Sequence, residues 1–102
     1  MALSRLHWKN YHGKAIISKG ASGGIATFYN SETKYTMKST KETNNWILTK
    51  LQCKDKQESI FVCNVYGPTH YKDKMIFWET LNLLSENLHG KDVILIGDFN
   101  TT

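Results

Sequence analysis

The 102-residue sequence has no long apolar run and no signal-like segment, and these absences exclude two kinds of protein. Its longest apolar stretches, such as Val93 to Ile96, fall far below the ~18 consecutive apolar residues of a membrane-spanning helix. The segment from Met1 to Trp8 lacks the apolar core of a secretory signal. We therefore expect an intracellular protein of the nucleus or cytoplasm that is not secreted and does not act at a membrane.

Cysteine is scarce, with only Cys53 and Cys63 present. A hairpin centred on Lys56 would place Ser59 opposite Cys53 and Thr49 opposite Cys63, so the two sulfurs would not meet. Two reduced thiols are the expected state, as is usual inside cells. The cysteines and histidines also lack the close paired spacing of a zinc site.

The charge of the chain is compatible with a polyanionic partner but does not require one. The formal net charge is +4, and basic domains often bind nucleic acid. The lysines, however, are spread along the sequence rather than gathered in one block, which is equally typical of a solvated surface. No repeat, low-complexity segment or linker divides the chain.

Apolar periodicity predicts an α/β fold with a mixed sheet. Residues 73–89 form the one clear helix, and its buried stripe is expected to contain Ile76, Phe77, Leu81, Leu84 and Leu88, with Gly90 as the C′ residue. The strands are expected at residues 14–18, 25–29, 35–39, 46–53, 59–66 and 93–97, with a glycine-rich turn at residues 19–24.

The strands at 59–66 and 93–97 are apolar on both faces, which is typical of strands covered on both sides. They flank the helix, so a right-handed crossover onto the same or an adjacent sheet is expected.

These two strands end in polar groups suited to phosphate chemistry. Asp98 and Asn100 would project from the same face, roughly 6–7 Å apart, because side chains i and i+2 of a strand point the same way. A carboxylate can orient or deprotonate a water, and an amide or the phenol of Tyr66 can donate to a phosphoryl oxygen. From the residues alone, a strand-end turn at Asp98 and an ordinary sheet aromatic at Tyr66 remain open.

Four motifs, in family-like order and spacing, resemble the endonuclease/exonuclease/phosphatase (DNase I-like) superfamily. The resemblance is closest to the apurinic-type endonuclease domain of plant LINE-type (non-LTR) retrotransposons. The motifs are Gly20-Ala21-Ser22-Gly23-Gly24-Ile25, Asn45-Trp46-Ile47-Leu48, Asn64-Val65-Tyr66-Gly67-Pro68 and Gly97-Asp98-Phe99-Asn100-Thr101.

The resemblance implies a partial four-layer α/β sandwich, with mixed β-sheets face to face and a flanking helix. It also implies that residues 1–102 are the central part of a single domain. The family places an early Asn and a metal-binding Glu before this part and a Ser-Asp-His tripeptide after it.

The implied activity of the intact domain is phosphodiester hydrolysis that depends on Mg²⁺ or Mn²⁺. The enzyme would nick DNA to prime a reverse transcriptase domain of the same polyprotein, and this chain alone is expected to be inactive. Asp98 would handle the attacking water or the leaving group, Asn100 would bind the scissile phosphate, and Tyr66 would donate to it.

Asn64 and Thr101 would line the substrate side of the same site, where Asn64 is expected to stabilise the local backbone more than to contact the substrate. No certain metal ligand is assigned among these residues, and no organic cofactor is expected. Two alternatives stay open. In the first, the same fold serves as a phosphatase or phosphodiesterase for a lipid or nucleotide. In the second, the chain is a catalytically dead remnant with weak nucleic-acid binding.

Overall fold

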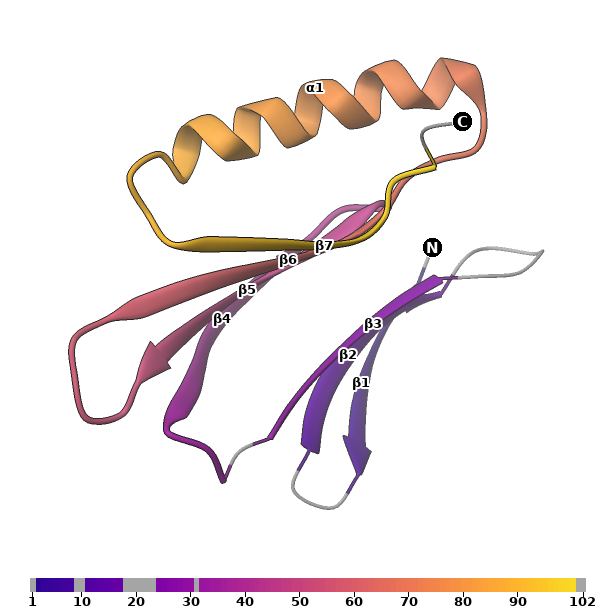
Figure 1. Cartoon of the computed structure of the whole chain (residues 1–102). Helices are drawn as coiled ribbons and strands as arrows, with labels where there is room; N and C mark the ends of the chain where they lie inside the picture. The colour runs from indigo at the N-terminus through magenta and orange to yellow at the C-terminus, as the bar shows by residue number, and fades with distance from the viewer. Residues whose placement is uncertain (1, 9–10, 18–23, 31, 101–102) are drawn as a thin grey trace.

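The computed structural model describes residues 2–8, 11–17, 24–30 and 32–100. In these residues two sheets lie face to face, and one helix covers the outer face of the second sheet (Figure 1). The elements in chain order are β1 (Ala2–Trp8), β2 (Tyr11–Ile17), β3 (Gly24–Asn30), β4 (Tyr35–Glu42), β5 (Trp46–Cys53), β6 (Ser59–Tyr66), α1 (Tyr71–Asn87) and β7 (Val93–Asp98).

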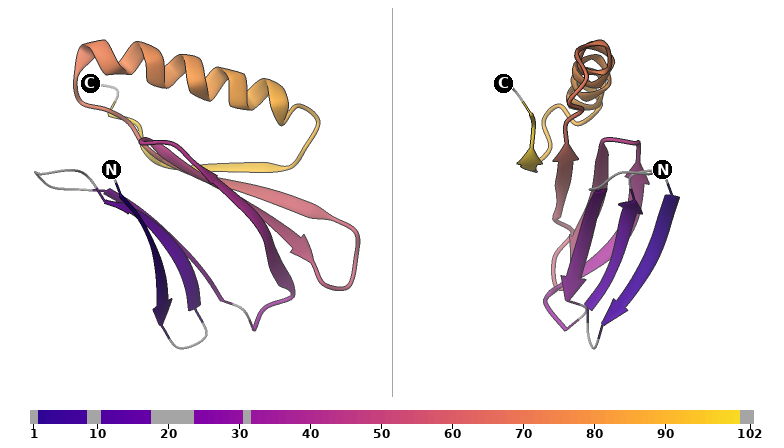
Figure 2. Two further views of the ribbon diagram at one scale, coloured as in Figure 1. Left: turned by 180° about the vertical axis from the view of Figure 1, so that it is seen from behind. Right: turned by 90° about the vertical axis from the view of Figure 1, so that its right-hand side faces the viewer.

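The first sheet is antiparallel, with the order β1-β2-β3, and the second is mixed, with the order β4-β5-β6-β7. β6 and β7 are parallel, because α1 returns the chain to the end of the sheet at which β6 begins, and β7 then runs in the same direction as β6. The helix, the mixed sheet and the antiparallel sheet make three layers (Figure 2). The predicted partial α/β sandwich is therefore confirmed, and β7 joins the same sheet as β6.

The core lies between α1 and the second sheet. Alternate residues of β5 and β6 face the helix, and they are buried with two helix residues in one cluster. This cluster contains Trp46, Leu48, Cys63, Val65, Phe77 and Leu81. β6 lies between β5 and β7, as its apolar character on both faces predicted.

The predicted helical stripe is correct except at Ile76. Phe77 and Leu81 are buried, and Leu84 and Leu88 pack against the core cluster. The side chain of Ile76 is 62% exposed, because it precedes Phe77 by one residue and so points about 100° away around the helix. Gly90 was predicted as the C′ residue of the helix. The C-cap is Leu88, so His89 occupies C′ and Gly90, with φ of +79°, lies one residue further on.

The prediction that β7 is covered on both faces is wrong for the described residues. Val93, Ile94, Leu95 and Ile96 are each 40–48% exposed. β7 is the last strand of the second sheet, so only β6 pairs with it there. The sequence encodes a strand with two apolar faces, and the described residues cover neither fully.

Some boundaries and one strand register also differ from expectation, and α1 begins and ends two residues earlier than predicted. β1 was not predicted, and β2 begins at Tyr11 rather than at residue 14. The hairpin register differs by one residue, because Gln52 rather than Cys53 is opposite Ser59. The predicted absence of a disulfide is confirmed, since Cys53 and Cys63 are both free. The glycine-rich turn at 19–24 lies almost wholly outside the described residues, and within those residues no helix has the length and apolar character needed to cross a membrane.

Candidate functional site

Tyr66 and Asp98 are brought together at one edge of the second sheet. They are direct partners in the parallel β6–β7 ladder, so both side chains project from the same face. The backbone N–H of Gly67 donates to the carbonyl of Asp98 at 2.6 Å, which extends the ladder to the strand ends. The backbone arrangement therefore places a phenol and a carboxylate on adjacent strands at this edge.

Asn64 identifies which face this is. Its side-chain Nδ2 donates to the carbonyl of Ala26 at 2.9 Å and to Oγ1 of Thr27 at 3.2 Å, and both acceptors belong to β3. Asn64, Tyr66 and Asp98 therefore share the face that is turned toward the first sheet, since they alternate with residues that face α1. The site lies at the end of the layer between the two sheets, on the opposite side of the second sheet from the helix (Figure 2).

Asn100 holds the two strand ends in place. Its backbone adopts a positive φ of 49°, which is a conformation that Asn tolerates better than most residues. The backbone N–H donates to Oδ1 of Asp98 at 3.0 Å, and the side-chain Nδ2 donates to the carbonyl of Gly67 at 2.6 Å. One N–H of the amide is thus engaged within the protein, which leaves the second for a substrate.

Asn45 is a residue of this edge to which the sequence analysis assigned no role. Its Nδ2 donates to the carbonyl of Tyr66 at 2.9 Å, and the backbone N–H of Tyr66 donates to the carbonyl of Asn45 at 2.7 Å. Asn45 precedes β5, so three adjacent strands contribute to one edge. Its position at the start of the Asn-Trp-Ile-Leu motif, immediately before a strand, was the signal that could have identified it.

Two glycines allow the strand ends to approach each other. A Cβ atom on Gly67 would overlap the carbonyl of Phe99, and one on Gly97 would overlap the carbonyl of Val65. Gly97 also has a φ of +132°, which side chains with a Cβ rarely adopt. The two glycines are thus required by the geometry that sets Asp98 beside Tyr66.

The charge at this edge comes from Asp98, which is exposed to solvent. Oδ1 accepts the bond from Asn100, and among the described residues nothing donates to Oδ2. Carboxylate oxygens suit Mg²⁺ or Mn²⁺, but within the described ranges no three His, Cys, Asp or Glu residues are placed to share a metal ion. The described residues on their own do not form a metal site.

Cys63 is not a candidate nucleophile. It is fully buried in the core cluster, and this burial raises the pKa of its thiol from 9.0 to about 11. The thiol is therefore protonated at neutral pH, and a thiolate is the form that reacts.

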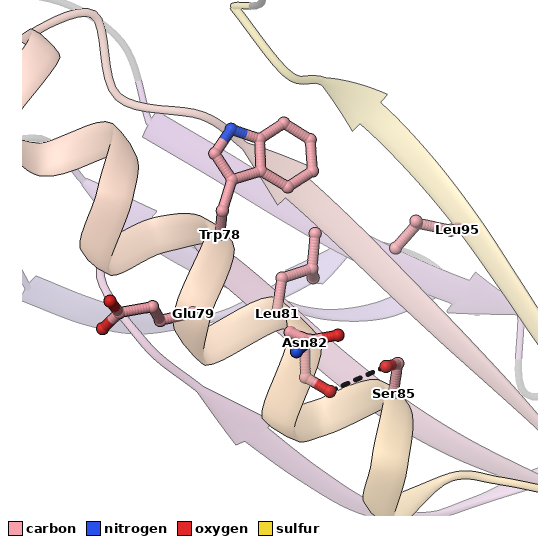
Figure 3. Close-up of a pocket in the computed structure, with 6 residues that line it drawn as sticks. All are labelled: Trp78, Glu79, Leu81, Asn82, Ser85 and Leu95. Carbon is pink, nitrogen blue, oxygen red and sulfur yellow. Dashed lines mark hydrogen bonds between the residues drawn. The ribbon is translucent and has the colours of Figure 1, made fainter.

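The large hollow beside α1 is not the chemical site either. It has a volume of about 550 Å³ and lies between α1 and Leu95 of β7. Figure 3 shows Leu81 pointing toward β7, whereas Glu79 points away. The bond from Oγ of Ser85 to the carbonyl of Asn82, at 2.7 Å, lies within one helical turn. The surface of the hollow is mostly apolar, and it lies on the helix side of the second sheet, away from Tyr66 and Asp98.

The predicted residues thus divide into three groups. Asp98 and Tyr66 are neighbours, Asn64 shares their face but bonds to β3, and Asn100 braces the strand ends. Thr101 lies outside the described residues. Their roles toward a substrate stay predictions.

Comparison with known proteins supports the fold. No family model matches the sequence, and no curated protein matches it. Among solved structures, the human Nocturnin catalytic domain with bound sulfate anion is similar, with a TM-score of 0.57 and 18% sequence identity. The similarity covers 91% of this chain and 44% of that one, so the chain spans less than half of the length of the structure it matches. At this identity the likeness concerns the fold alone, and it agrees with the predicted partial α/β sandwich.

Proposed function

We propose that this chain supplies the Asp98–Tyr66 edge of a metal-dependent phosphodiesterase, and that the intact domain is the DNA-nicking endonuclease of a retrotransposon. The observation that carries the proposal is the register of β6 and β7, which pairs Tyr66 with Asp98 at the carboxyl ends of parallel strands. In α/β sheets, ligands commonly bind at this end of the strands. DNA is the proposed substrate because the four motifs, in family order, resemble those of a DNA-nicking endonuclease.

In this proposal Asp98 handles a proton and Tyr66 stabilises charge. Oδ1 of Asp98 is fixed by the backbone N–H of Asn100, which leaves Oδ2 to accept a proton from a water or to orient it. The phenol of Tyr66 donates to the phosphoryl oxygen on which charge develops. Asn100 positions both groups by binding the Gly67 carbonyl, and its remaining amide N–H contacts the phosphate.

The proposed dependence on Mg²⁺ or Mn²⁺ belongs to the intact domain. Such an ion, when bound, neutralises the negative charge of a phosphodiester during hydrolysis. Its ligands would come largely from the Glu-containing segment that the family places before this part. The chain alone is therefore expected not to nick DNA. The solved Nocturnin domain contains a sulfate anion, and sulfate has a tetrahedral shape and oxygens like those of a phosphate.

A second candidate function keeps the fold and changes the substrate to a phosphorylated lipid or a nucleotide. The edge of Asp98, Tyr66 and Asn100 would serve any phosphoester, so it does not discriminate between these substrates. A dead remnant with weak nucleic-acid binding is the remaining alternative, and it predicts no cleavage of any substrate.

The test is a substitution series in a domain completed with the family's flanking segments. Asp98→Asn keeps the size of the side chain and removes the charge, so kcat for plasmid nicking should fall about 10²–10⁴-fold while DNA affinity changes far less. Tyr66→Phe should slow nicking more mildly. Asp73→Asn is the matched control, because Asp73 lies in the first turn of α1.

The same variants should be assayed with a phosphoinositide and a mononucleotide in place of plasmid. Cleavage of either in preference to DNA would favour the second candidate. If Asp98→Asn nicked DNA within about threefold of wild type in a folded domain, the assignment of Asp98 would be wrong. Asp98 would then be a residue of a strand-end turn.

A further inference from the structure

The opposite end of the second sheet carries a group of lysines that the proposed activity does not use. Lys41 on β4, Lys50 on β5 and Lys91 before β7 line one hollow of about 480 Å³ beside the last turn of α1. We call it the lysine hollow. It lies on the helix side of the sheet, whereas Tyr66 and Asp98 face the other sheet and lie at the other end of β6 and β7.

The sheet register explains why the lysines converge. Lys50 is opposite Phe61 in the β5–β6 ladder, and Lys41 is opposite Leu48 in the β4–β5 ladder. Leu48 faces α1 in the core cluster, so the side chains of Lys41 and Lys50 project on the helix side as well. Lys91 approaches from the connection after α1, where its backbone N–H donates to the carbonyl of Leu88 at 3.0 Å.

Two of these cations lie near the ring of Phe61. Nζ of Lys50 is 5.9 Å and Nζ of Lys91 is 5.7 Å from the centroid of the ring. Each distance is within the range of a cation–π contact. Three lysines thus line the hollow, and no carboxylate of the described residues lines it with them. An anion bound in the hollow would offset this positive charge.

The apolar residues that form the floor of the hollow indicate which chemical group, besides the anion, the ligand contains. Leu48, Phe61, Leu84 and Leu88 contribute apolar surface beneath the cations, and Ser39 and Asn87 add polar groups at the rim. The volume falls in the usual range for small-ligand sites, ~300–1,000 Å³. A ligand that joins a phosphate to a flat, largely apolar group satisfies both the lysines and the floor.

We infer that the lysine hollow is a second, non-catalytic binding site for a nucleotide phosphate, either as a free nucleotide or as a unit of a nucleic acid. The simpler explanation is that the lysines offset the partial negative charge at the C-terminal end of α1. Lys41 and Lys50 lie on strands rather than in the helix end, so helix capping does not account for their position. The two explanations make different predictions for ligand binding.

The test is a titration of the 102-residue chain with adenosine 5′-monophosphate (AMP), followed by the NMR signals of the Phe61 ring and the lysine side chains. AMP should shift these signals, and the triple variant K41Q/K50Q/K91Q should bind it at least about tenfold more weakly, since charge-assisted bonds are lost. The matched control K38Q/K56Q/K72Q removes the same charge at exposed positions and should change affinity less than about twofold.

Two further ligands identify the source of the phosphate and the role of the floor. A single-stranded oligodeoxynucleotide that shows the same dependence on Lys41, Lys50 and Lys91 would assign the site to nucleic acid if AMP itself binds weakly. The inference would be overturned if adenosine bound as tightly as AMP. It would also be overturned if the two triple variants bound AMP and the oligonucleotide equally tightly. The single variant K91Q, changed at an exposed position, keeps the test informative if the triple variant does not fold.

Discussion

Substitution of Asn64 distinguishes a structural role of this residue from a role in substrate binding. Its amide joins the two sheets through the Ala26 carbonyl at 2.9 Å and Oγ1 of Thr27 at 3.2 Å. A neutral hydrogen bond contributes a net ~0.5–1.5 kcal/mol, and the Asn64 amide makes two such bonds. We therefore expect Asn64→Ala to lower the free energy of unfolding by about 2 kcal/mol.

The measurement is urea unfolding followed by tryptophan fluorescence, to which Trp46, buried in the core cluster, contributes. With an m-value of about 2 kcal/mol/M, the midpoint should fall by roughly 1 M. Asn64→Asp should be at least as destabilising, because it replaces the donor with a carboxylate that faces the Ala26 carbonyl. Asn44→Ala is the control, since Asn44 is exposed before β5 and its loss should shift stability by less than about 0.5 kcal/mol.

The reasoning would be refuted by an Asn64→Ala variant as stable as wild type. If that same substitution also slowed cleavage in a completed domain, Asn64 would be a substrate-binding residue, as the sequence analysis predicted. If stability falls and the remaining folded enzyme cleaves normally, its role is to hold the sheets together at the site.

Three further results are expected. Cys63 remains protonated in the folded state up to its pKa of about 11, against 9.0 for the ordinary thiol, so the contribution of this thiol to stability should be constant below pH 9 and decrease between pH 9 and 11. A Cys63→Ala variant that shows the same alkaline decrease in urea titrations would contradict this. Gly97→Ala should destabilise the chain by several kcal/mol, because its Cβ would overlap the Val65 carbonyl at a φ of +132°. Gly90→Ala, with open space around it but φ of +79°, should cost only about 1 kcal/mol. Equal losses of stability for the two variants in thermal unfolding would argue against the overlap. Mass spectrometry of the unreduced chain should find no loss of two hydrogens, since both cysteines are free.

The sequence predicted the parts of the fold that depend on local apolar pattern. β5, β6, β7 and α1 were found within a few residues, because each has an apolar run or an apolar face that is typical of its structure. The adjacency of Tyr66 and Asp98 was also accessible, since both residues end apolar strands flanking one helix. The pairing of parallel strands then places these ends at one edge.

The remaining features depend on partners that are distant in sequence. β1 was missed because its pairing with β2, rather than a strong alternation of its own residues, makes it a strand. The exposure of β7 follows from its position at the end of the described sheet order. The hydrogen bond from Asn100 to Gly67 spans 33 residues, and no sequence pattern in either segment predicts it. Asn45 was noticed only as part of a motif for the same reason.

The parallel pairing of β6 with β7 has a consequence for the order of folding. Partners such as Phe61 and Val93 are 32 residues apart (93 − 61), whereas β5 and β6 are joined by a short turn. Closing the longer loop costs more chain entropy, and non-local pairings of this kind form slowly. We expect the β4–β5–β6 meander and α1 to form first and β7 to dock afterwards. The edge that carries Asp98 would then be among the last parts of the chain to assemble, and its amide protons should exchange with solvent while those of β5 are still protected.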